Sequence, residues 1–442
     1  MLIALLAQVT LAQVLEPEMS SPQLRRAIPG VCIMDGQGKE LFGRNADTLL
    51  MPASNQKLLT VAYALARLGP QTRFETKIWK HPMGWYVDAP GHPDLTYAQI
   101  VGAREQLRIA KGSTILVRQP FRPEIPPGWE WDDLPNKYAA KPGALTVDRG
   151  SFELWANKGR LTLRPANYGV VVKKMGGKRR RLTYDFSNRV IRVWGPVPSA
   201  PARIDTLAVP EPDEAAASVF GGKLVPTEEP PPPEGPALVL QSAPLIEIAT
   251  ACLQDSDNNL AENLLLMAAA KEGPLGDEPY ETAAARLTEF LLEDVGFEKG
   301  SVRPVDGSGL SRHNLITPRS LVKILTHART VWGDLWSGAL AAPGNGTLKQ
   351  RLIGSPFKGK TGSLNSVQAI SGYSVDGQAN PLVIVLVFNN TTSPASEIRA
   401  IQDAIVRKIE SYRDGTDIDA YDHREGRNPH QSHPALYRHR GR

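Results

Sequence analysis

Three short strings that occur in one order constrain the fold of this chain more than any other feature of its sequence. The first is Ser54-Asn55-Gln56-Lys57, the second is Ser256-Asp257-Asn258 and the third is Lys360-Thr361-Gly362. About 200 residues separate the first string from the second, whereas connections between neighbouring elements rarely exceed about 15 residues. The gap therefore predicts that whole domains are inserted between the first two strings.

The first string, S-x-x-K, is a weak signal by itself because the chain contains it three times, at Ser54, Ser320 and Ser355. Ser54 opens a segment of helical periodicity, residues 54–68, so its hydroxyl is expected near the unpaired backbone N–H groups of a helix start. Ser320 lies inside an amphipathic helical pattern, and Ser355 precedes a proline in a turn. Local context thus selects Ser54, for which a plain helix N-cap is the alternative interpretation.

A serine hydroxyl becomes an effective nucleophile only when a base removes its proton. Lys57 lies one helical turn after Ser54 on the same face, within reach of that hydroxyl. A lysine can act as the base only if its pKa is lowered, either by burial or by a second cation. Lys360 of the third string is the candidate for that cation, so Ser54, Lys57 and Lys360 are expected to form one unit.

The second string supplies polar groups next to this unit. Ser256 is expected to relay a proton between Lys57 and a leaving amine. The side-chain amide of Asn258 is expected to hold both Lys57 and a substrate amide. The same string is also a typical N-cap for the helical pattern that follows it, and a capping role is compatible with the polar roles of Ser256 and Asn258.

The third string precedes strand-like sequence and is suited to hold a substrate. Gly362 has no Cβ, so a substrate backbone can lie against the strand. The backbone N–H groups of Ser363 and Ser54 are expected to form an oxyanion hole. The hydroxyls of Thr361 and Ser363, beside Lys360, suit a free carboxylate on the substrate.

Together, S-x-x-K, S-D-N and K-T-G are the signature of serine enzymes that acylate on penicillin or on D-alanyl-D-alanine peptides. With these residues the chain resembles the low-molecular-mass class C penicillin-binding proteins, the D-alanyl-D-alanine carboxypeptidase/endopeptidase family. The resemblance covers residues 25–412 and is also carried by the segments 52–60, 91–95, 128–154, 257–265, 306–317 and 360–373.

The resemblance implies an α+β fold: a penicillin-binding-protein/β-lactamase-like catalytic domain, with helices on an antiparallel sheet, and two inserted β-rich domains. It implies a hydrolase that cleaves D-alanyl-D-alanine peptides of peptidoglycan through a Ser54 acyl-enzyme, that β-lactams inhibit, and that uses no cofactor or metal. The family also binds the amino group of the stem peptide's diamino acid through an acidic residue of an inserted domain. Asp133 is the candidate here, and Asp132 or a plain solvated loop carboxylate are the alternatives.

Changes in residue composition and in hydrophobic periodicity divide the chain into segments. Strand-like sequence rich in Gly, Pro and Trp begins near residue 75, residues 228–236 form a polyproline linker, and helical patterns return at residue 243. We therefore predict a signal segment at 1–15, a catalytic domain at 16–75 and 243–412, a first inserted domain at 76–150 and 206–242, a second inserted β-rich domain at 151–205 and a disordered tail at 413–442.

Both ends of the chain carry a prediction. Residues 2–13 form an apolar run that ends in small residues and is too short to span a bilayer, which favours a secretory signal and an extracytoplasmic (periplasmic or secreted) protein. No Lys or Arg precedes Arg25, so a buried N-terminal helix is the alternative. Residues 413–442 contain few apolar side chains, which predicts disorder, and their four histidines lack a regular metal-ligand spacing.

The net charge of +5 is small for a chain of 442 residues. We expect it to be spread along the chain, with residues 173–181 forming a solvated hairpin that has a basic tip. Such a charge favours peripheral association with the cell wall or a membrane surface and does not indicate nucleic-acid binding. Cys32 and Cys252 are too few for a disulfide scaffold and read as buried small hydrophobes.

Two other functions remain open at the level of sequence. A β-lactamase needs a base for the deacylating water, commonly a glutamate in a loop between the second and third strings, whereas Glu289 and Glu293 lie on helix-like sequence. A non-catalytic peptidoglycan-binding protein with the same fold would be expected to have lost at least one of the five polar residues Ser54, Lys57, Ser256, Asn258 and Lys360.

Overall fold

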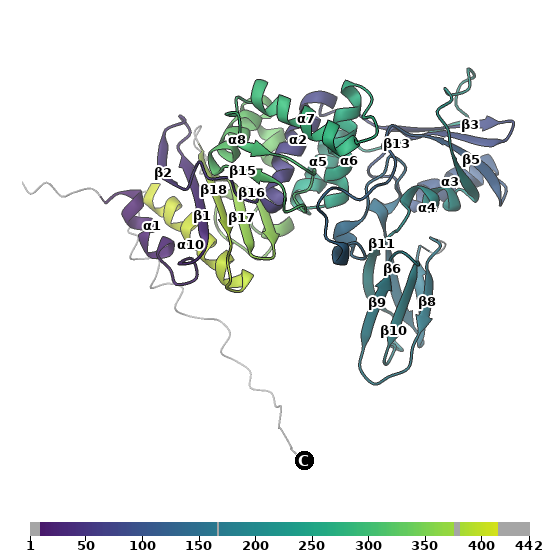
Figure 1. Ribbon diagram of the computed structural model, residues 1–442, viewed down its shortest axis with the longest axis horizontal. Coiled ribbons are helices and arrows are strands. Elements are labelled where there is room, and N and C mark those ends of the chain that lie inside the picture. The colour runs from purple at the N-terminus through teal and green to yellow at the C-terminus, as the bar shows by residue number, and fades with distance from the viewer. Residues whose placement is uncertain (1–8, 166–167, 375–380, 414–442) are drawn as a thin grey trace, which may run out of the picture.

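The computed structural model describes residues 9–165, 168–374 and 381–413 (Figure 1). Its larger domain is built on a five-stranded antiparallel sheet with the strand order β16-β17-β18-β1-β2. Two strands come from the start of the chain and three from its end, and β1 pairs with β18. The strands are β1 (Ile28–Met34), β2 (Glu40–Arg44), β16 (Phe357–Leu364), β17 (Val367–Ser374) and β18 (Leu382–Asn389). This confirms the predicted α+β domain that both ends of the sequence complete.

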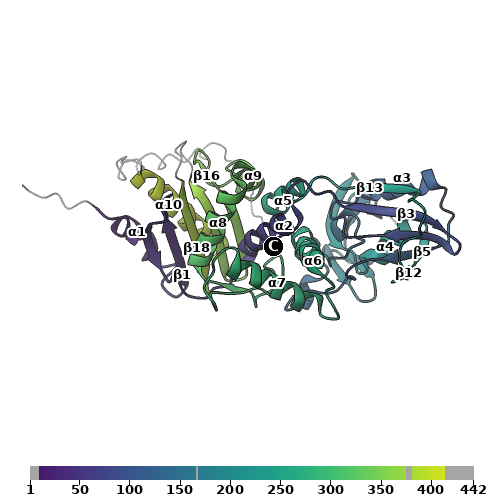
Figure 2. The same ribbon diagram turned by 90° about the horizontal axis from the view of Figure 1, so that it is seen from above.

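Helices cover both faces of this sheet (Figure 2). All eight residues of β18 are buried, which explains why the strand is apolar at nearly every position. α1 (Leu11–Met19) packs on α10 (Ala395–Arg413) against one face. The opposite face is covered by α2 (Gln56–Leu68), α5 (Leu245–Gln254), α6 (Asn258–Glu272), α7 (Pro279–Glu293), α8 (Pro318–Trp332) and α9 (Asp334–Ala339). The short strands β14 (Val302–Arg303) and β15 (Leu315–Ile316) pair with each other beside them.

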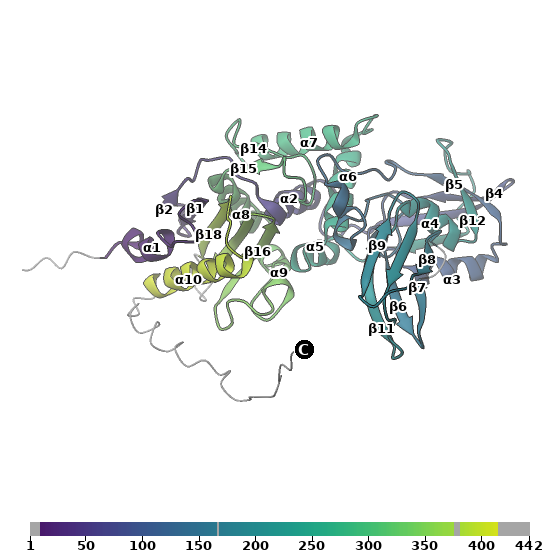
Figure 3. The same ribbon diagram turned by 60° about the horizontal axis from the view of Figure 1, so that its bottom comes forward.

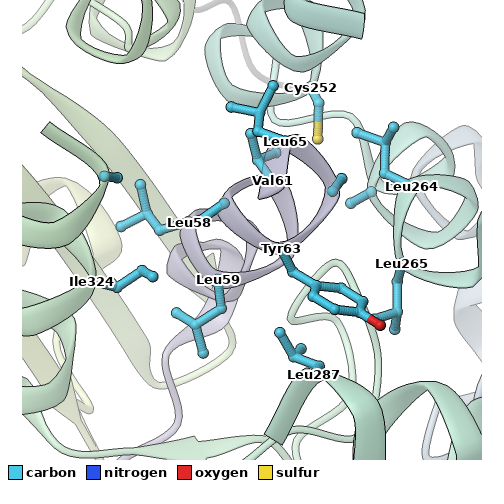
Figure 4. Packing of buried hydrophobic residues seen from close by; sticks show 14 of the residues in the cluster. Leu58, Leu59, Val61, Tyr63, Leu65, Cys252, Leu264, Leu265, Leu287 and Ile324 are labelled. Atoms are coloured by element: carbon cyan, nitrogen blue, oxygen red, sulfur yellow. The ribbon is translucent and has the colours of Figure 1, made fainter. Parts of the chain in front are cut away.

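α2 lies at the centre of the helical layer. Every residue from Gln56 to Leu65 is buried, as expected of a helix that is surrounded on all sides. Figure 4 shows Leu58 directed toward Ile324 of α8, and Tyr63 between side chains of α6 and α7. Cys252 packs in the same core, and both cysteines are free and buried, as predicted. The packing of α2 fixes the position of the turn that precedes it.

The apolar run near the N-terminus differs from the prediction. α1 begins at Leu11, after a capping box formed by Thr10 and Gln13, and buries Leu15 completely. Glu18 forms an ion pair of 2.8 Å with Lys408 of α10. The predicted boundary of the signal segment at residue 15 falls inside this helix, and the alternative of a buried N-terminal helix describes residues 11–19. Residues 1–8 of the predicted signal segment and the predicted tail from residue 414 onward lie outside the described residues.

The first inserted domain contains a mixed sheet with the strand order β12-β5-β4-β3-β13. β5 runs parallel to both of its neighbours, and the other pairs are antiparallel. The domain also contains two helices, so it is less purely β than predicted. Its elements are β3 (Glu75–His81), β4 (Gly84–Asp88), α3 (Tyr97–Leu107), β5 (Ser113–Arg118), α4 (Pro212–Val219), β12 (Gly222–Pro226) and β13 (Leu238–Gln241).

The polyproline segment does not stand free of this domain. The indole of Trp79 donates a hydrogen bond of 2.8 Å to the carbonyl of Glu234, and the hydroxyl of Tyr86 donates one of 2.7 Å to the carbonyl of Glu229. Residues 228–236, which connect β12 to β13 in sequence, therefore pack on this sheet through β3 and β4. The prediction that they form a linker is wrong.

The second inserted domain projects from the first (Figures 1 and 3). Two three-stranded sheets, β11-β6-β7 and β8-β10-β9, enclose its core. Its strands are β6 (Ser151–Asn157), β7 (Arg160–Arg164), β8 (Val171–Lys174), β9 (Arg181–Asp185), β10 (Val190–Trp194) and β11 (Ala202–Ala208). β11 continues past the predicted boundary at residue 205.

Two predictions about this domain are wrong. β8 and β9 both pair with β10 and not with each other, so residues 173–181 connect two edge strands and do not form a hairpin. The positive charge is also not spread along the chain, because residues 151–208 hold twelve Lys or Arg and only three Asp or Glu.

Residues 128–150 run from the inserted domains along the start of α6. They contain three short 3-10 helices, η2 (Trp131–Asp133), η3 (Lys137–Ala139) and η4 (Asp148–Gly150). The side-chain amide of Asn259 donates to the carbonyl of Lys141 at 2.8 Å, and Asn263 accepts from the backbone N–H of Gly143 at 3.1 Å. These contacts hold an inserted segment against the larger domain. In the part of the chain that the structure describes, no helix is both long enough and apolar enough to cross a bilayer.

Candidate active site

Ser54 lies in a 3-10 turn, η1 (Ala53–Asn55), that leads directly into α2. Ala53 has a positive φ of 48°, a strained conformation for a residue with a side chain. Gly309 packs against this turn so closely that a Cβ on it would lie 1.9 Å from the carbonyl oxygen of Ala53. The turn is therefore held from outside, and Ser54 faces a cleft of about 840 Å³.

Lys57 is completely buried one turn after Ser54. Its Nζ lies 2.9 Å from Oγ of Ser54, 2.6 Å from Oδ1 of Asn258 and 2.7 Å from the carbonyl oxygen of Ser308. The amide of Asn258 is oriented by its Nδ2, which donates to the carbonyl of Tyr138 at 2.7 Å. The first and second strings, distant in sequence, therefore meet at one nitrogen atom.

The second string occupies the turn before α6. Asp257, not Ser256, is the N-cap of this helix and accepts from the backbone N–H of Leu260 at 3.0 Å. Arg149 of the inserted segment holds the other carboxylate oxygen of Asp257 at 3.2 Å. Ser256 itself has a positive φ of 58°. Because Asp257 performs the capping, the hydroxyl of Ser256 is directed toward the third string instead.

Lys360 of β16 is also completely buried. Its Nζ donates to Oγ of Ser256 and to the carbonyl of Thr361, both at 2.8 Å. The five polar residues predicted from the three strings form two neighbouring hydrogen-bonded groups, one of Ser54, Lys57 and Asn258 and the other of Ser256 and Lys360. Ser54, Asn258 and Ser256 line the same cleft.

Burial governs the charge of both lysines. It lowers the pKa of Lys57, although Asp306, Glu262 and Asp257 act in the opposite direction. Burial and the nearby charge of Lys57 place the pKa of Lys360 well below its ordinary value. Two buried ammonium groups in one cluster repel each other, so the site favours a state in which at least one lysine is neutral.

β16 brings the third string beside the turn that holds Ser54. A Cβ on Gly362 would lie 2.9 Å from the carbonyl oxygen of Pro52 and 3.0 Å from the backbone nitrogen of Ser54. Only glycine permits this approach. Ser363 accepts a hydrogen bond of 2.7 Å from Nε2 of Gln368. Thr361, Gly362 and Ser363 line a second cavity of about 580 Å³ that shares Ser54 with the main cleft.

Sequence reasoning missed the loop that supplies the third partner of Lys57. Residues 306–314 carry the Ser308 carbonyl, and two buried carboxylates hold this loop. Glu262 accepts from the backbone N–H groups of Gly307 and Ser308, each at 2.8 Å. Burial and the adjacent Asp306 raise the pKa of Glu262 to about 8.

Asp306 anchors the same loop from within. It accepts from the backbone N–H groups of Gly309 and Ser311 and from the side chains of Asn314 and Trp129, at 2.7 to 2.9 Å. The loop, with its glycines and its buried aspartate, was visible in the sequence as a segment without an assigned role. No side-chain pattern could indicate that a backbone carbonyl is its contribution.

Asp133 lies in the wall of the main cleft and accepts a hydrogen bond of 2.6 Å from the hydroxyl of Tyr138. Arg312 lies in the same wall, paired with Glu130 at 2.9 Å. Asp132 is exposed and does not line this cleft. Of the two carboxylates considered from the sequence, only Asp133 therefore borders the cavity that holds Ser54.

The other two S-x-x-K matches have structural partners. Ser320 is buried in the first turn of α8, where its hydroxyl donates to Oγ of Ser301 at 2.9 Å, and Lys323 instead donates to the carbonyl of Gly296. Ser355 bonds Glu410 at 2.8 Å. Neither serine has its own motif lysine as a hydrogen-bond partner. In the described residues no group of three or more His, Cys, Asp or Glu side chains could hold a metal ion.

A serine hydroxyl beside a buried lysine, with the edge of an antiparallel sheet closing over it, places the protein in the class of penicillin-recognising serine hydrolases. The family model described as D-Ala-D-Ala carboxypeptidase 3 (S13) matches residues 11–412, and the chain belongs to this family. The family predicted from the sequence is thereby confirmed.

Individual relatives agree with this assignment. A D-alanyl-D-alanine carboxypeptidase of Actinomadura sp. (strain R39) is 28% identical over 89% of this chain and 83% of its own length. The crystal structure of penicillin binding protein 4 (dacB) from Haemophilus influenzae has a TM-score of 0.73 at 22% identity, covering 92% of this chain and 99% of that one. A structure of the same H. influenzae protein, complexed with a β-lactam, has a TM-score of 0.70 at 21% identity and covers 92% and 100%.

Proposed function

We propose that this enzyme cleaves the terminal D-alanine, or a D-alanyl cross-link, from peptidoglycan stem peptides through an acyl-enzyme on Ser54. The observation that carries the proposal is the set of partners around Nζ of Lys57. Two of them, Oδ1 of Asn258 and the Ser308 carbonyl, can only accept hydrogen bonds. A neutral lysine has two N–H groups, which these acceptors use, so its lone pair is directed at the remaining partner, the Ser54 hydroxyl.

The reaction then follows from the hydrogen-bond network. Lys57 takes the proton of Ser54 as Oγ attacks the carbonyl between the two D-alanines, and the charge that develops on oxygen is held by the backbone N–H groups of Ser54 and Ser363. When the C–N bond breaks, the proton that Lys57 took from Ser54 passes through the hydroxyl of Ser256, which Lys360 holds by a hydrogen bond, to the leaving amine. Lys57 is then neutral again and can take a proton from the water that attacks the ester. Water then hydrolyses the ester and restores the Ser54 hydroxyl.

Substrate recognition is proposed on both sides of Ser54. The hydroxyls of Thr361 and Ser363 line the second cavity and would bind the terminal carboxylate of the peptide. Asp133, which lines the main cleft, would bind the amino group of the diamino acid side chain as its counter-ion. Tyr138 fixes the orientation of this carboxylate through its hydroxyl.

β-Lactams are proposed as inhibitors that acylate Ser54 and leave slowly, which agrees with the β-lactam complex of the H. influenzae relative. We also propose that the enzyme acts outside the cytoplasm, where peptidoglycan lies, with peripheral association to the cell wall or a membrane surface. None of these steps needs a cofactor or a metal ion.

Labelling with a fluorescent penicillin tests the nucleophile directly. We expect one labelled peptide, which contains Ser54, and no label in Ser54→Ala. Ser320→Ala and Ser355→Ala are matched controls because each removes the serine of another S-x-x-K string, and both should label as well as the wild type. Label at any other serine would overturn the assignment of Ser54.

The substrate is tested with peptides that end in D-alanyl-D-alanine and carry a diamino acid with either a free or an acetylated side-chain amine. We expect release of D-alanine to be faster from the free amine, and Asp133→Asn to reduce kcat/KM for that peptide by about tenfold or more while hardly changing the acetylated one. Asp132→Asn is the matched control and should leave both rates unchanged. An equal loss for both peptides would rule out the proposed role of Asp133.

The β-lactamase alternative has little support in the geometry. Glu289 and Glu293, the glutamates considered for a deacylating base, are exposed on α7 and do not line the cleft. Rapid turnover of penicillin, in place of a long-lived acyl-enzyme, would reverse this ranking.

A further inference from the structure

The second inserted domain carries a positive charge that the rest of the chain does not share. With twelve Lys or Arg and three Asp or Glu, residues 151–208 have a formal charge of +9, whereas the whole chain has +5. The remaining residues are therefore net negative. A small sandwich that concentrates charge in this way is a candidate for binding a polyanion.

Strand pairing shows at which end of the sandwich the cations lie. Ser151 pairs with Ala208 where the sandwich joins the first inserted domain, and Asn157 pairs with Arg160 at the opposite end. In the other sheet, Arg181 pairs with Trp194. Lys174, at the end of β8, donates to the carbonyl of Gly159 in the turn between β6 and β7 at 3.3 Å, so both sheets end together.

We call this end the basic tip and define it by seven exposed cations: Lys158, Arg160, Lys174, Lys178, Arg179, Arg180 and Arg181. Within the described residues, none of the seven forms an ion pair with a carboxylate. The nearest acidic side chains are already used, since Glu153 binds Arg203 and Asp185 binds Arg192. The charge of the tip is therefore available to an external partner.

The tip is convex, because it consists of a tight turn and a loop at the projecting end of the sandwich (Figures 1 and 3). An extended anionic surface can contact several of the seven cations together, whereas a small anion would contact fewer. Single-stranded nucleic acid is a poorer match, since it needs open aromatic faces for stacking. The rings of Trp155 and Trp194 are instead covered by the guanidinium groups of Arg164 and Arg181, at 4.3 and 5.4 Å from the ring centres.

We propose that the basic tip docks on the anionic phospholipid headgroups of a membrane surface. Each Lys or Arg near such a surface strengthens binding by about fivefold at moderate salt, and the attraction decreases within a Debye length. The tip is the free end of the second inserted domain, which in Figure 1 projects below the place where the first inserted domain meets the larger domain. The proposal does not depend on the catalytic roles of the cleft residues.

Co-sedimentation of the full chain with lipid vesicles tests this docking. We expect binding to vesicles of phosphatidylcholine mixed with phosphatidylglycerol, little binding to pure phosphatidylcholine, and release by added salt. The triple variant Lys178→Gln, Arg179→Gln, Arg180→Gln changes only exposed loop residues without packing contacts in the core. It should bind about 100-fold more weakly to the anionic vesicles.

The matched control removes the same charge elsewhere, with Lys39→Gln, Lys111→Gln and Lys271→Gln, all exposed and outside the sandwich. It should bind like the wild type, and both variants should react with fluorescent penicillin like the wild type. Equal losses in the two triple variants would overturn the basic tip as the docking surface. If the wild type bound soluble poly(glycerol phosphate), a mimic of an anionic wall polymer, but not the anionic vesicles, the membrane would be the wrong partner.

Discussion

Nζ of Lys57 lies 2.6 Å from Oδ1 of Asn258, although 201 positions separate the two residues in the sequence. Asn258 reaches this position because Asp257 caps α6 and because its own amide nitrogen is bound to the Tyr138 carbonyl of the inserted segment. The inserted segment therefore helps to hold a hydrogen-bond partner of Lys57 in place, in addition to lining the cleft.

The first prediction concerns the pH dependence of acylation. Because burial lowers the pKa of Lys57 below its ordinary value of 10.5, the lysine loses its proton at a lower pH than in a free peptide. The rate of acylation by benzylpenicillin should therefore rise with pH, and the midpoint of this rise should lie below pH 10.5. Stopped-flow measurement of acyl-enzyme formation across the pH range checks this, and a rate that decreased over that range would contradict a neutral Lys57.

The second prediction places a negative charge beside Lys57. Asn258→Asp keeps an acceptor oxygen near Nζ, but a carboxylate at this distance raises the pKa of Lys57 by about 1 to 3 pH units. Acylation should then be about 10- to 1000-fold slower at neutral pH and recover as the pH rises. Asn258→Ala is the control: it removes the acceptor without adding a charge, so its rate should be low at every pH. If the two variants had the same pH profile, charge at this position would not control Lys57.

Much of this cluster could be predicted from the sequence, because the three strings place side chains whose chemistry is explicit. Lys57 follows Ser54 by one helical turn, and the apolar periodicity of residues 54–68 predicts the helix that carries it. The strands at both ends of the chain were also visible, since β18 is a continuous apolar run.

Other features could not be predicted because they depend on tertiary contacts. The role of the Ser308 carbonyl is invisible in a side-chain pattern, since it depends on where Glu262 and Asp306 hold a loop. α3 escaped notice because it buries only Ile100 and Ala103 and so lacks a clear apolar stripe. The apolar run at residues 2–13 favours a leader when the sequence is considered alone, whereas the packing of α1 on α10 agrees with the alternative of a buried helix for residues 11–19.

The third prediction tests the loop that carries Ser308. In Glu262→Gln one of the two acceptor oxygens becomes an NH₂ group, which would face the backbone N–H of Gly307 or Ser308. An unsatisfied buried donor costs about 1 to 3 kcal/mol, so thermal unfolding should show a loss of this size. Acylation should also slow by more than tenfold, because the Ser308 carbonyl loses its alignment with Lys57. Unchanged acylation in a folded variant would show that the loop does not position this lysine.

The same glutamate predicts a pH dependence of stability. The pKa of Glu262 is about 8 in the folded protein and 4.5 in an unstructured chain. Between these values the folded protein retains a proton that the unfolded chain releases, so the free energy of unfolding should decrease as the pH rises from 4.5 to about 8. Melting temperatures measured over this range should show a smaller decrease in Glu262→Gln than in the wild type. An identical decrease would assign it to other groups.

The last prediction concerns the close approach of β16 to the turn that holds Ser54. In Gly362→Ala the new methyl group would lie 2.9 Å from the Pro52 carbonyl oxygen and 3.0 Å from the Ser54 nitrogen, so the strand and the turn must separate. Overpacking of this kind costs about 1 to 3 kcal/mol, and displacing an oxyanion-hole donor slows acylation by about 100- to 1000-fold.

Gly102→Ala in α3 is the control, because nothing lies within 4 Å of its new Cβ and alanine favours a helix by about 1 kcal/mol over glycine. Benzylpenicillin acylation and thermal unfolding should therefore both worsen in Gly362→Ala, whereas Gly102→Ala should react normally and melt at or above the wild-type temperature. Normal acylation in Gly362→Ala would mean that β16 does not contribute to the oxyanion hole.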